Sequence, residues 1–495
     1  MDHKIMAGLN RNHHLDKTPF LPGFIIATLI VVLQGCGGTP LKPWHTEKLT
    51  EEFTEDKTDE VRSFDDYLQL EDRLYMQLDE KVYAQTETGP KHQLDRYSSG
   101  SSADPRKHAP DWNRSFELKA DNLRGAVLLI HGMSDSPYSL RTLGRALNDN
   151  GFWVVGMRMP GHGTAPSGLR HISRHDMAAA VRIGMAHLDQ KANGKPVHMI
   201  GYSTGAPLAL EFALDALDGS TAPVPGSLIL ISPAIGIHRT AGFASFKDWL
   251  SNIPGLDGLA YTQIQPEFDP YKYNSFATNA ADVVHGLTRS VAGRVEQRAG
   301  SNPGIVLPPV LVFKSTVDAT VTTEAVVDNL LEHLKPDRHE LILFDINRYA
   351  ASYRLLVDDP APLTDRVMDD DKLPFTVTLV TNQGPDTTRV ISKYKSPYST
   401  DVSNSRQLAL SWPPGVISLS HVALPIAPDD PLYGQRMPNR EDFVFLGQLA
   451  IQGERGLLTI PADWLFRLRY NPFYDYLEHR MLDWVEKANT QALQQ

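Results

Sequence analysis

Short apolar runs alternate with helix-forming segments from residue 125 onward. The runs are GAVLLI (125–130), FWVVGM (152–157), PVHMI (196–200), SLILIS (227–232) and PVLVFK (309–314). Each run is almost continuously apolar, which is typical of strands that are covered on both faces of a sheet. The segments between them, such as 139–151 and 174–190, have the composition of helices. The pattern predicts an α/β protein with a doubly wound, mostly parallel sheet, whose functional residues gather where the strands end.

The sequence GYSTG follows the run 196–200 and precedes the helix-forming segment 206–217. A serine between two glycines also arises by chance, so the pattern alone does not identify a nucleophile. Here Gly201 and Gly205 leave room for a tight turn that lifts the Ser203 hydroxyl above the sheet. Because a strand comes before the turn and a helix after it, we predict that Ser203 is a nucleophile rather than an ordinary turn serine.

A serine hydroxyl needs a base that takes its proton and an acid that orients the base. On this kind of scaffold the three residues follow in the chain order serine, acid, histidine. Asp318 lies in the loop after the run 309–314, and His421, in PPGVISLSHVALP, is expected at the end of another strand. We predict that Asp318 and His421 complete a triad with Ser203. Asp345, which ends the apolar segment HELILF, remains the alternative acid.

The other histidines fit the role of base less well. His198 lies inside a predicted strand, where a packed and hydrogen-bonded imidazole is expected. His171 and His175 lie at the start of a predicted helix and are expected at the surface.

The loop HGMSDSP follows the first core strand and is the candidate source of an oxyanion hole. Backbone N–H groups stabilise a developing oxyanion when they point at it before the reaction starts. The N–H groups of Met133 and of Thr204, the residue after the nucleophile, are the predicted donors. His131 and Gly132 are expected to shape this loop.

The first residues of the chain suggest export. A basic region is followed by the apolar run FIIATLIVVL (24–33), which is short for a membrane span but suits a signal peptide. LQGCGG follows and resembles the bacterial lipoprotein signal, with Cys36 as the lipid-bearing residue after cleavage. Residues 1–35 are therefore expected to be a signal peptide, and the protein is expected to be lipid-anchored in the bacterial cell envelope. The alternative is an uncleaved anchor followed by an incidental cysteine.

Composition narrows the partners further. With 48 basic and 59 acidic side chains the net charge is −11, which disfavours binding to nucleic acid. Cys36 is the one cysteine in the sequence, so no disulfide can form within the chain. Residues 36–111 are polar, apart from an amphipathic helix predicted near 64–78, and are expected to be an extension that lies against the main domain.

Taken together, these motifs resemble the α/β-hydrolase superfamily, in particular its monoacylglycerol lipase and serine aminopeptidase-like branch. HGMSDSP, PGHGTAP (160–166), GYSTG and the order of Asp318 and His421 carry the resemblance, which covers about residues 112–488. The resemblance implies a serine hydrolase that needs neither a cofactor nor a metal. It also implies a cap inserted over the pocket within 234–307. In that cap Phe243, Phe246, Trp249, Leu250 and Leu259 either line an acyl cleft or pack the cap's own core.

Two features depart from the family pattern. Ala206 replaces the glycine expected after the elbow, and about a hundred residues separate Asp318 from His421. The excess, 346–410, is expected to be an insertion beside the active site, with an acidic loop (358–372) and a β-hairpin joined near 384–385. The acidic loop lacks the spacing of a calcium loop and is expected to be solvated. The core is thus divided into 112–233, 308–345 and 411–495.

The sequence favours a serine esterase that acts on a small acyl ester or a lipid through an acyl-enzyme intermediate. An amidase or peptidase with the same triad is one alternative, because one triad serves both reactions. A non-catalytic scaffold in the envelope is the other alternative.

Overall fold

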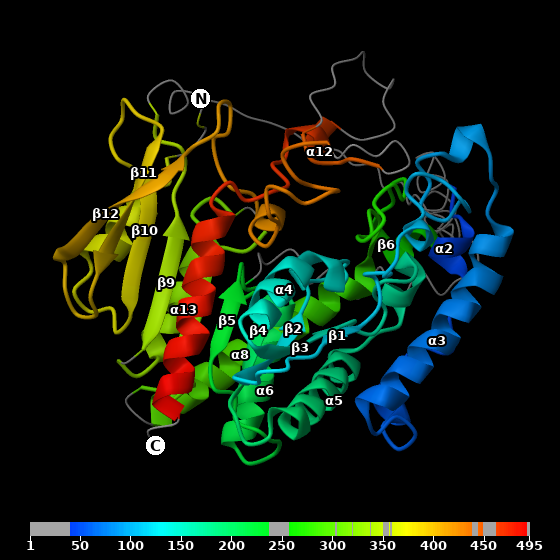
Figure 1. Ribbon diagram of the computed structural model, residues 1–495, viewed down its shortest axis with the longest axis horizontal. Coiled ribbons are helices and arrows are strands. Elements are labelled where there is room, and N and C mark those ends of the chain that lie inside the picture. The colour runs from blue at the N-terminus through cyan, green and yellow to red at the C-terminus, as the bar shows by residue number, and fades with distance from the viewer. Residues whose placement is uncertain are drawn as a thin grey trace, which may run out of the picture. The chain divides into compact units, whose positions relative to one another are not determined.

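The computed structural model describes residues 40–492 except 237–256, 302–303, 319, 337, 350–355, 357–358, 438–443 and 449–461. A ten-stranded sheet forms its centre, in the order β1-β3-β2-β4-β5-β8-β9-β10-β11-β12 (Figure 1). The parallel strands are β2 (Gly125–Ile130), β3 (Phe152–Met157), β4 (Val197–Tyr202), β5 (Leu228–Ile231), β8 (Val310–Ser315), β9 (His339–Phe344) and β10 (Thr376–Asn382). The predicted α/β class with a mostly parallel sheet is confirmed.

The two edges of the sheet are antiparallel. β1 (Phe116–Leu118) pairs with β3 at one edge, and β11 (Arg389–Lys395) and β12 (Val402–Ser411) extend the other edge beyond β10. β2 is the first strand of the parallel set in the chain, and the strands after it lie on both of its sides. The strand order therefore changes direction between β2 and β4. In open α/β sheets, ligands bind in the crevice at such a point.

Helices cover both faces of the sheet. One face carries α4 (Arg141–Asp149) and α13 (Tyr474–Ala492), and the other carries α5 (Arg174–Ala192), α6 (Gly205–Leu217) and α8 (Thr278–Ser301) (Figure 1). Successive side chains of β2 point to opposite faces. Leu129 packs with Leu143 of α4 and Leu477 of α13, whereas Leu128 joins the cluster that contains Leu208 of α6. This explains why the core strands are apolar along their whole length.

The polar extension belongs to the same compact unit as the sheet. It contains α2 (Pro43–Thr46) and α3 (Phe64–Lys81), and α3 begins at a capping box formed by Ser63 and Asp66. Arg158, at the end of β3, is fully buried and pairs with Glu52 at 2.9 Å and with Glu71 of α3 at 3.0 Å. Two carboxylates of the extension therefore neutralise a cation of the core.

Short elements connect the larger ones. The remaining helices are α9 (Thr323–Asn329), α11 (Ala361–Asp369) and α12 (Ala462–Phe466). The 3-10 turns are η1 (Glu55–Lys57), η2 (Tyr83–Gln85), η3 (Pro90–His92), η4 (Pro105–Lys107), η5 (Pro137–Leu140), η6 (Pro166–Arg170), η8 (Asp257–Ala260), η9 (Leu331–His333) and η10 (His421–Ala423).

Of the region expected to be a cap, 234–307, the structure describes 234–236, 257–301 and 304–307. The region contains a two-stranded sheet of β6 (Tyr261–Gln263) and β7 (Phe276–Ala277), followed by α8. The Tyr273 N–H donates to the Ser134 carbonyl at 2.7 Å, so this region contacts the loop after β2. Of the five residues expected to line or pack a cap, Leu259 is described and is half-buried. Phe243, Phe246, Trp249 and Leu250 lie outside the described residues.

The predicted hairpin at 376–395 is present, but it extends the main sheet instead of forming a separate loop structure. β10 pairs with β9 in parallel, and β11 folds back against β10. β12 is a third strand that the sequence analysis did not predict. Its sequence, VSNSRQLALS, is mostly polar and its first six residues are exposed, so it lacks the apolar signal of a core strand.

The strand expected directly before His421 is absent from the described structure. The chain leaves β12 at Ser411, passes through Pro413, Pro414 and Gly415, and reaches His421 at the start of a 3-10 turn. Two consecutive prolines remove the backbone donors that a strand needs, so the apolar residues after them pack as a loop.

The signal-peptide segment and Cys36 lie outside the described residues. Within the described ranges, no helix has both the length and the apolar character needed to cross a membrane.

Candidate active site

The backbone turn that carries Ser203 is tightly constrained. Ser203 follows β4 with a positive φ of 52°, which is strained for a residue with a side chain. A Cβ on Gly205 would stand 2.0 Å from the carbonyl oxygen of Ile130, and a Cβ on Gly201 would stand 2.5 Å from the Cα of Ala206. Only glycine therefore fits on either side of the serine, which remains partly accessible.

Three side chains that are far apart in the sequence form one hydrogen-bonded chain. His421 Nε2 lies 3.0 Å from Ser203 Oγ, and His421 Nδ1 lies 2.8 Å from Asp318 Oδ2. The Ser203 and Asp318 loops follow the carboxyl ends of β4 and β8, and His421 reaches them from the loop after β12. The structure thus brings together the three predicted triad residues, in the order nucleophile, base and acid that proton transfer requires.

Asp318 is held as an ionised acid. Its Oδ1 accepts hydrogen bonds from the N–H groups of Thr320 at 2.8 Å and Val321 at 3.1 Å, and its Oδ2 contacts Lys314 Nζ as well as His421. Burial alone would raise the pKa of Asp318, but the hydrogen bond from His421 and the charges of His421 and Lys314 hold it well below its usual range.

His421 is a buried base with a lowered pKa. Burial disfavours the imidazolium and is the largest cause. The hydrogen bond and charge of Asp318 oppose that effect, whereas the positive charges of Lys314 and Lys272 add to it. The balance favours the neutral imidazole, which is the form that can accept a proton from Ser203.

Lys314 is part of this site, and the sequence analysis missed it. It is the fifth residue of β8, is fully buried, and donates to the Val321 carbonyl at 2.7 Å as well as contacting Asp318. Burial lowers the pKa of Lys314 to about 8, and the carboxylate of Asp318 opposes the shift. The available signal was a lysine in an otherwise apolar strand, four residues before the candidate acid.

Asp345, the alternative acid, is engaged elsewhere. Its carboxylate pairs with Arg348 and accepts the Thr381 hydroxyl at 2.7 Å. It follows β9, the next strand in the sheet after β8, and its described partners are Arg348, Thr381 and the Ile346 N–H. The structure therefore brings Asp318 to His421 and leaves Asp345 in the neighbouring strand loop.

The predicted oxyanion loop lies beside the nucleophile. A Cβ on Gly132 would stand 2.9 Å from the Cβ of Ser203, so the loop backbone closely approaches the serine. His131 holds the loop, since its Nε2 accepts the Met159 N–H at 3.0 Å. Throughout the described chain, the N–H groups of Met133 and Thr204 donate to no protein acceptor.

The remaining histidines lie where the sequence analysis expected them. His198 is buried in β4, with Nδ1 2.8 Å from Ser227 Oγ and Nε2 2.9 Å from Asn489 Oδ1. His171 and His175 are exposed. In the described ranges, no three His, Cys, Asp or Glu side chains gather closely enough to hold a metal ion.

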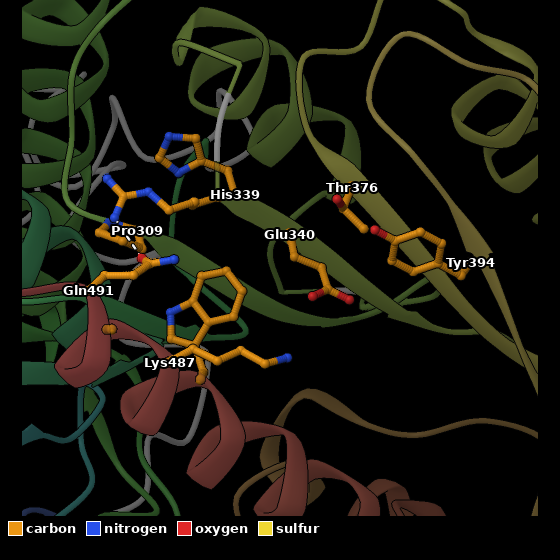
Figure 2. Close-up of a pocket in the computed structure, with 10 residues that line it drawn as sticks. Pro309, His339, Glu340, Thr376, Tyr394, Lys487 and Gln491 are labelled. Atoms are coloured by element: carbon orange, nitrogen blue, oxygen red, sulfur yellow. Dashed lines mark hydrogen bonds between the residues drawn. The ribbon is translucent and has the colours of Figure 1, made fainter. Parts of the chain in front are cut away.

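Two cavities lie near opposite ends of the strands of the sheet. A small cavity lies between the oxyanion loop and the histidine loop, with Asp135 and Val422 in its wall. A larger cavity lies at the amino ends of the strands, where β8, β9 and β10 begin near the end of α13 (Figure 2). Its Arg338 donates to Gln491 at 2.7 Å, and its lining contains none of the triad residues. The lining of the smaller cavity contains no triad residue either, but Asp135 and Val422 belong to the loops that carry Met133 and His421.

Residues 121–346 match the family model described as serine aminopeptidase, S33, which includes the Ser203 elbow and Asp318. The chain has the α/β-hydrolase fold. Within this fold, the loops after β2, β4 and β8 are the positions at which the oxyanion donors, the nucleophile and the acid are expected.

Similar proteins include a carboxylesterase of Bacillus subtilis (strain 168), 24% identical over 201 residues that cover 40% of this chain and 74% of the relative. A thermostable monoacylglycerol lipase of Bacillus sp. (strain H-257) is 32% identical over 148 residues, covering 29% of this chain and 58% of the relative. Among solved structures, a monoacylglycerol lipase of Paleococcus ferrophilus has a TM-score of 0.36 at 20% identity, covering 47% of this chain and 88% of that one. The family model ends at residue 346, so the extension before residue 121 and the strands β10, β11 and β12 lie outside the match.

Proposed function

We propose that this chain is a serine esterase that cleaves carboxylic esters through an acyl-enzyme intermediate on Ser203. The observation that carries the proposal is the hydrogen-bonded chain from Ser203 Oγ through His421 to Asp318, set on a strained turn at the end of β4. A strained turn that glycines alone can flank is costly, so its presence supports a functional rather than a structural serine.

The mechanism follows from these contacts. His421 Nε2 takes the proton from Ser203 Oγ as the oxygen attacks the ester carbonyl carbon. The negative charge moves to the carbonyl oxygen, where the N–H groups of Met133 and Thr204 are available to donate to it. His421 then gives its proton to the departing alcohol, and Asp318 stabilises the imidazolium in between. A water molecule, activated by the same histidine, releases the acid and restores Ser203.

The relatives named carboxylesterase and monoacylglycerol lipase support esters as the substrate class. The same triad also cleaves amides, so the substrate decides between the two reactions. A panel of para-nitrophenyl esters of increasing acyl length, set beside aminoacyl para-nitroanilides, tests this point. We expect higher kcat/KM for the esters. Faster cleavage of the anilides would make the chain a peptidase, and no turnover of either class would favour a non-catalytic scaffold.

We further propose that Cys36 carries a lipid and holds the protein on a membrane of the bacterial envelope. The apolar run 24–33 and the LQGC sequence support this proposal. Replacing Cys36 by Ser is expected to move the protein from the membrane fraction to the soluble fraction while kcat/KM for a soluble ester stays unchanged. If the Cys36→Ser protein still requires detergent, another part of the chain holds it on the membrane.

A further inference from the structure

The smaller cavity lies between the oxyanion loop and the histidine loop. It is lined by Asp135 and Ser139 from the oxyanion side, by Val422 and Ile426 from the histidine side, and by Lys272, Tyr433 and Arg469. Val422 follows His421 in the chain, and the positive charge of Lys272 acts on His421.

Two of the lining side chains are cations without a protein anion bound to them. Arg469 is 4% exposed, and its guanidinium lies over the ring of Trp464 at 3.7 Å. Lys272 is half-buried. In the part of the chain that the structure describes, the side chains of Lys272 and Arg469 form no ion pair and donate no hydrogen bond to protein oxygens.

Carboxylates and cations both act on these two side chains. Burial lowers the pKa of Lys272 and lowers the pKa of Arg469 to about 10; Asp269 opposes both shifts, and the exposed Arg467 adds repulsion to both. Asp135 opposes the shift of Lys272, but burial raises the pKa of Asp135 itself to about 6. Like charges gathered in a desolvated wall are costly unless an anion joins them.

The nearest other carboxylate is already satisfied. Asp269 accepts the Tyr433 hydroxyl at 2.6 and 2.7 Å on its two oxygens, and accepts the N–H groups of Tyr271 and Lys272 at 3.0 and 3.1 Å. These bonds occupy both oxygens of Asp269, although its charge still acts on Lys272 and Arg469. Lys272 and Arg469 line the cavity, and Asp269 is not among its lining residues.

We propose that this cavity is an anion subsite of the active site, and that the esters cleaved at Ser203 carry a carboxylate or a phosphate that binds between Lys272 and Arg469. The proposal rests on the proposed esterase function and specifies its substrate class. Arg469 presents a planar pair of N–H donors suited to two oxygens of the anion, and Lys272 adds a second charge.

Matched pairs of esters that differ in one charge test the subsite. On the alcohol side, meta-butyryloxybenzoate is compared with its methyl ester. On the acyl side, para-nitrophenyl hydrogen adipate is compared with its methyl ester. In the wild type we expect kcat/KM to be higher for the anionic member of at least one pair. The pair that shows the preference identifies the side of the ester that carries the anion, and a glycerol phosphate butyrate tests phosphate against carboxylate.

Variants separate charge recognition from catalysis. Arg469→Met is expected to reduce the ratio of anionic to neutral kcat/KM by about tenfold or more, the range for hydrogen bonds to charged groups. Turnover of the neutral ester and the melting temperature report on whether the protein is still folded. Lys272→Met should act in the same direction, and Arg469→Lys should restore part of the preference. Arg406→Met, on the exposed strand β12, is the matched control and should leave the ratio unchanged.

The two proposals fail in different ways. If the neutral esters are hydrolysed and neither pair shows a preference for the anion in the wild type, the subsite proposal is wrong and the esterase proposal stands. An unchanged ratio in folded Arg469→Met and Lys272→Met proteins would overturn it as well. If no ester of either charge is hydrolysed, the esterase proposal itself is wrong.

Discussion

Gly132 lies so close to Ser203 that a Cβ built on Gly132 would stand 2.9 Å from the Cβ of Ser203. Both atoms would be fixed to the backbone, so neither could move aside without shifting the turn or the oxyanion loop. The loop and the turn that carries Ser203 are therefore positioned by close contact.

Replacing Gly132 by Ala should displace the oxyanion loop. We expect kcat to fall by about a hundredfold to a thousandfold, the cost of losing one oxyanion donor, with a smaller change in KM. Gly293→Ala is the control, because a Cβ on Gly293 in α8 meets nothing within 4 Å. Steady-state kinetics of both variants on a para-nitrophenyl ester measure the effect. Unchanged kcat in Gly132→Ala would mean that the loop does not supply an oxyanion donor.

Replacing Lys314 by Met should change the pH dependence of the reaction. The neutral His421 is the active form, so activity is lost as the pH falls through the pKa of His421. Lys314 contributes to lowering that pKa, together with burial and Lys272 and against Asp318. The acidic limb of kcat/KM in Lys314→Met should therefore move to higher pH. Lys195→Met, at an exposed site, is the control. A limb that stays in place or moves to lower pH would contradict the role given to Lys314.

Replacing Asp318 by Asn should disable His421 as a base, although a side chain of the same shape still lies beside its Nδ1 atom. The amide stabilises the wrong tautomer of His421, which costs about ten-thousandfold in kcat in a serine protease. Asp345→Asn is the matched variant, because Asp345 pairs with Arg348 and not with His421. We expect kcat close to that of the wild type in folded Asp345→Asn protein. The reverse result, with Asp318→Asn active and Asp345→Asn inactive, would move the acid to Asp345.

Replacing Glu71 by Ala should lower the stability of the whole protein. It removes one carboxylate from the fully buried Arg158 and the acceptor of the Ser115 hydroxyl, 2.7 Å away. We expect the free energy of unfolding in urea to fall by about 3 kcal/mol, as when a buried ion pair loses one partner. Glu51→Ala removes an exposed ion pair with Arg73 and should cost less than about 1 kcal/mol. Equal losses in the two variants would mean that the buried pair does not fasten the extension to the core.

The core strands could be predicted because burial on both faces leaves a clear apolar signal. The runs at 125–130, 152–157 and 309–314 each correspond to a strand whose ends lie within one residue of the predicted ends. β12 carries no such signal, since it lies at the sheet edge with most of its side chains in solvent. The loop before His421 was mistaken for a strand because its residues are apolar; it forms a backbone hydrogen bond from the Asn347 N–H to the Ile417 carbonyl at 2.7 Å, but no strand.

Ser203 and Asp318 could be predicted from chain order and from their positions after strands, and His421 from chain order. Contacts between distant parts of the chain could not be predicted in this way. Arg158 pairs with Glu52 of the extension, and Lys272 of the cap region lines the same cavity as Val422 of the histidine loop. Lys314 was the exception, because a lysine at the end of an apolar strand is unusual and could have been noticed.

The most direct test of the account is mass spectrometry of the protein after reaction with a fluorophosphonate, which labels activated serines. The account predicts one adduct, located on Ser203, with loss of ester hydrolysis in proportion to labelling. It also predicts that folded Ser203→Ala protein forms no adduct and hydrolyses no ester. Ser405→Ala, a matched change on the exposed strand β12, should still form the adduct and hydrolyse the ester. An adduct on another residue, or ester hydrolysis retained by Ser203→Ala, would contradict the assignment of Ser203 as the nucleophile.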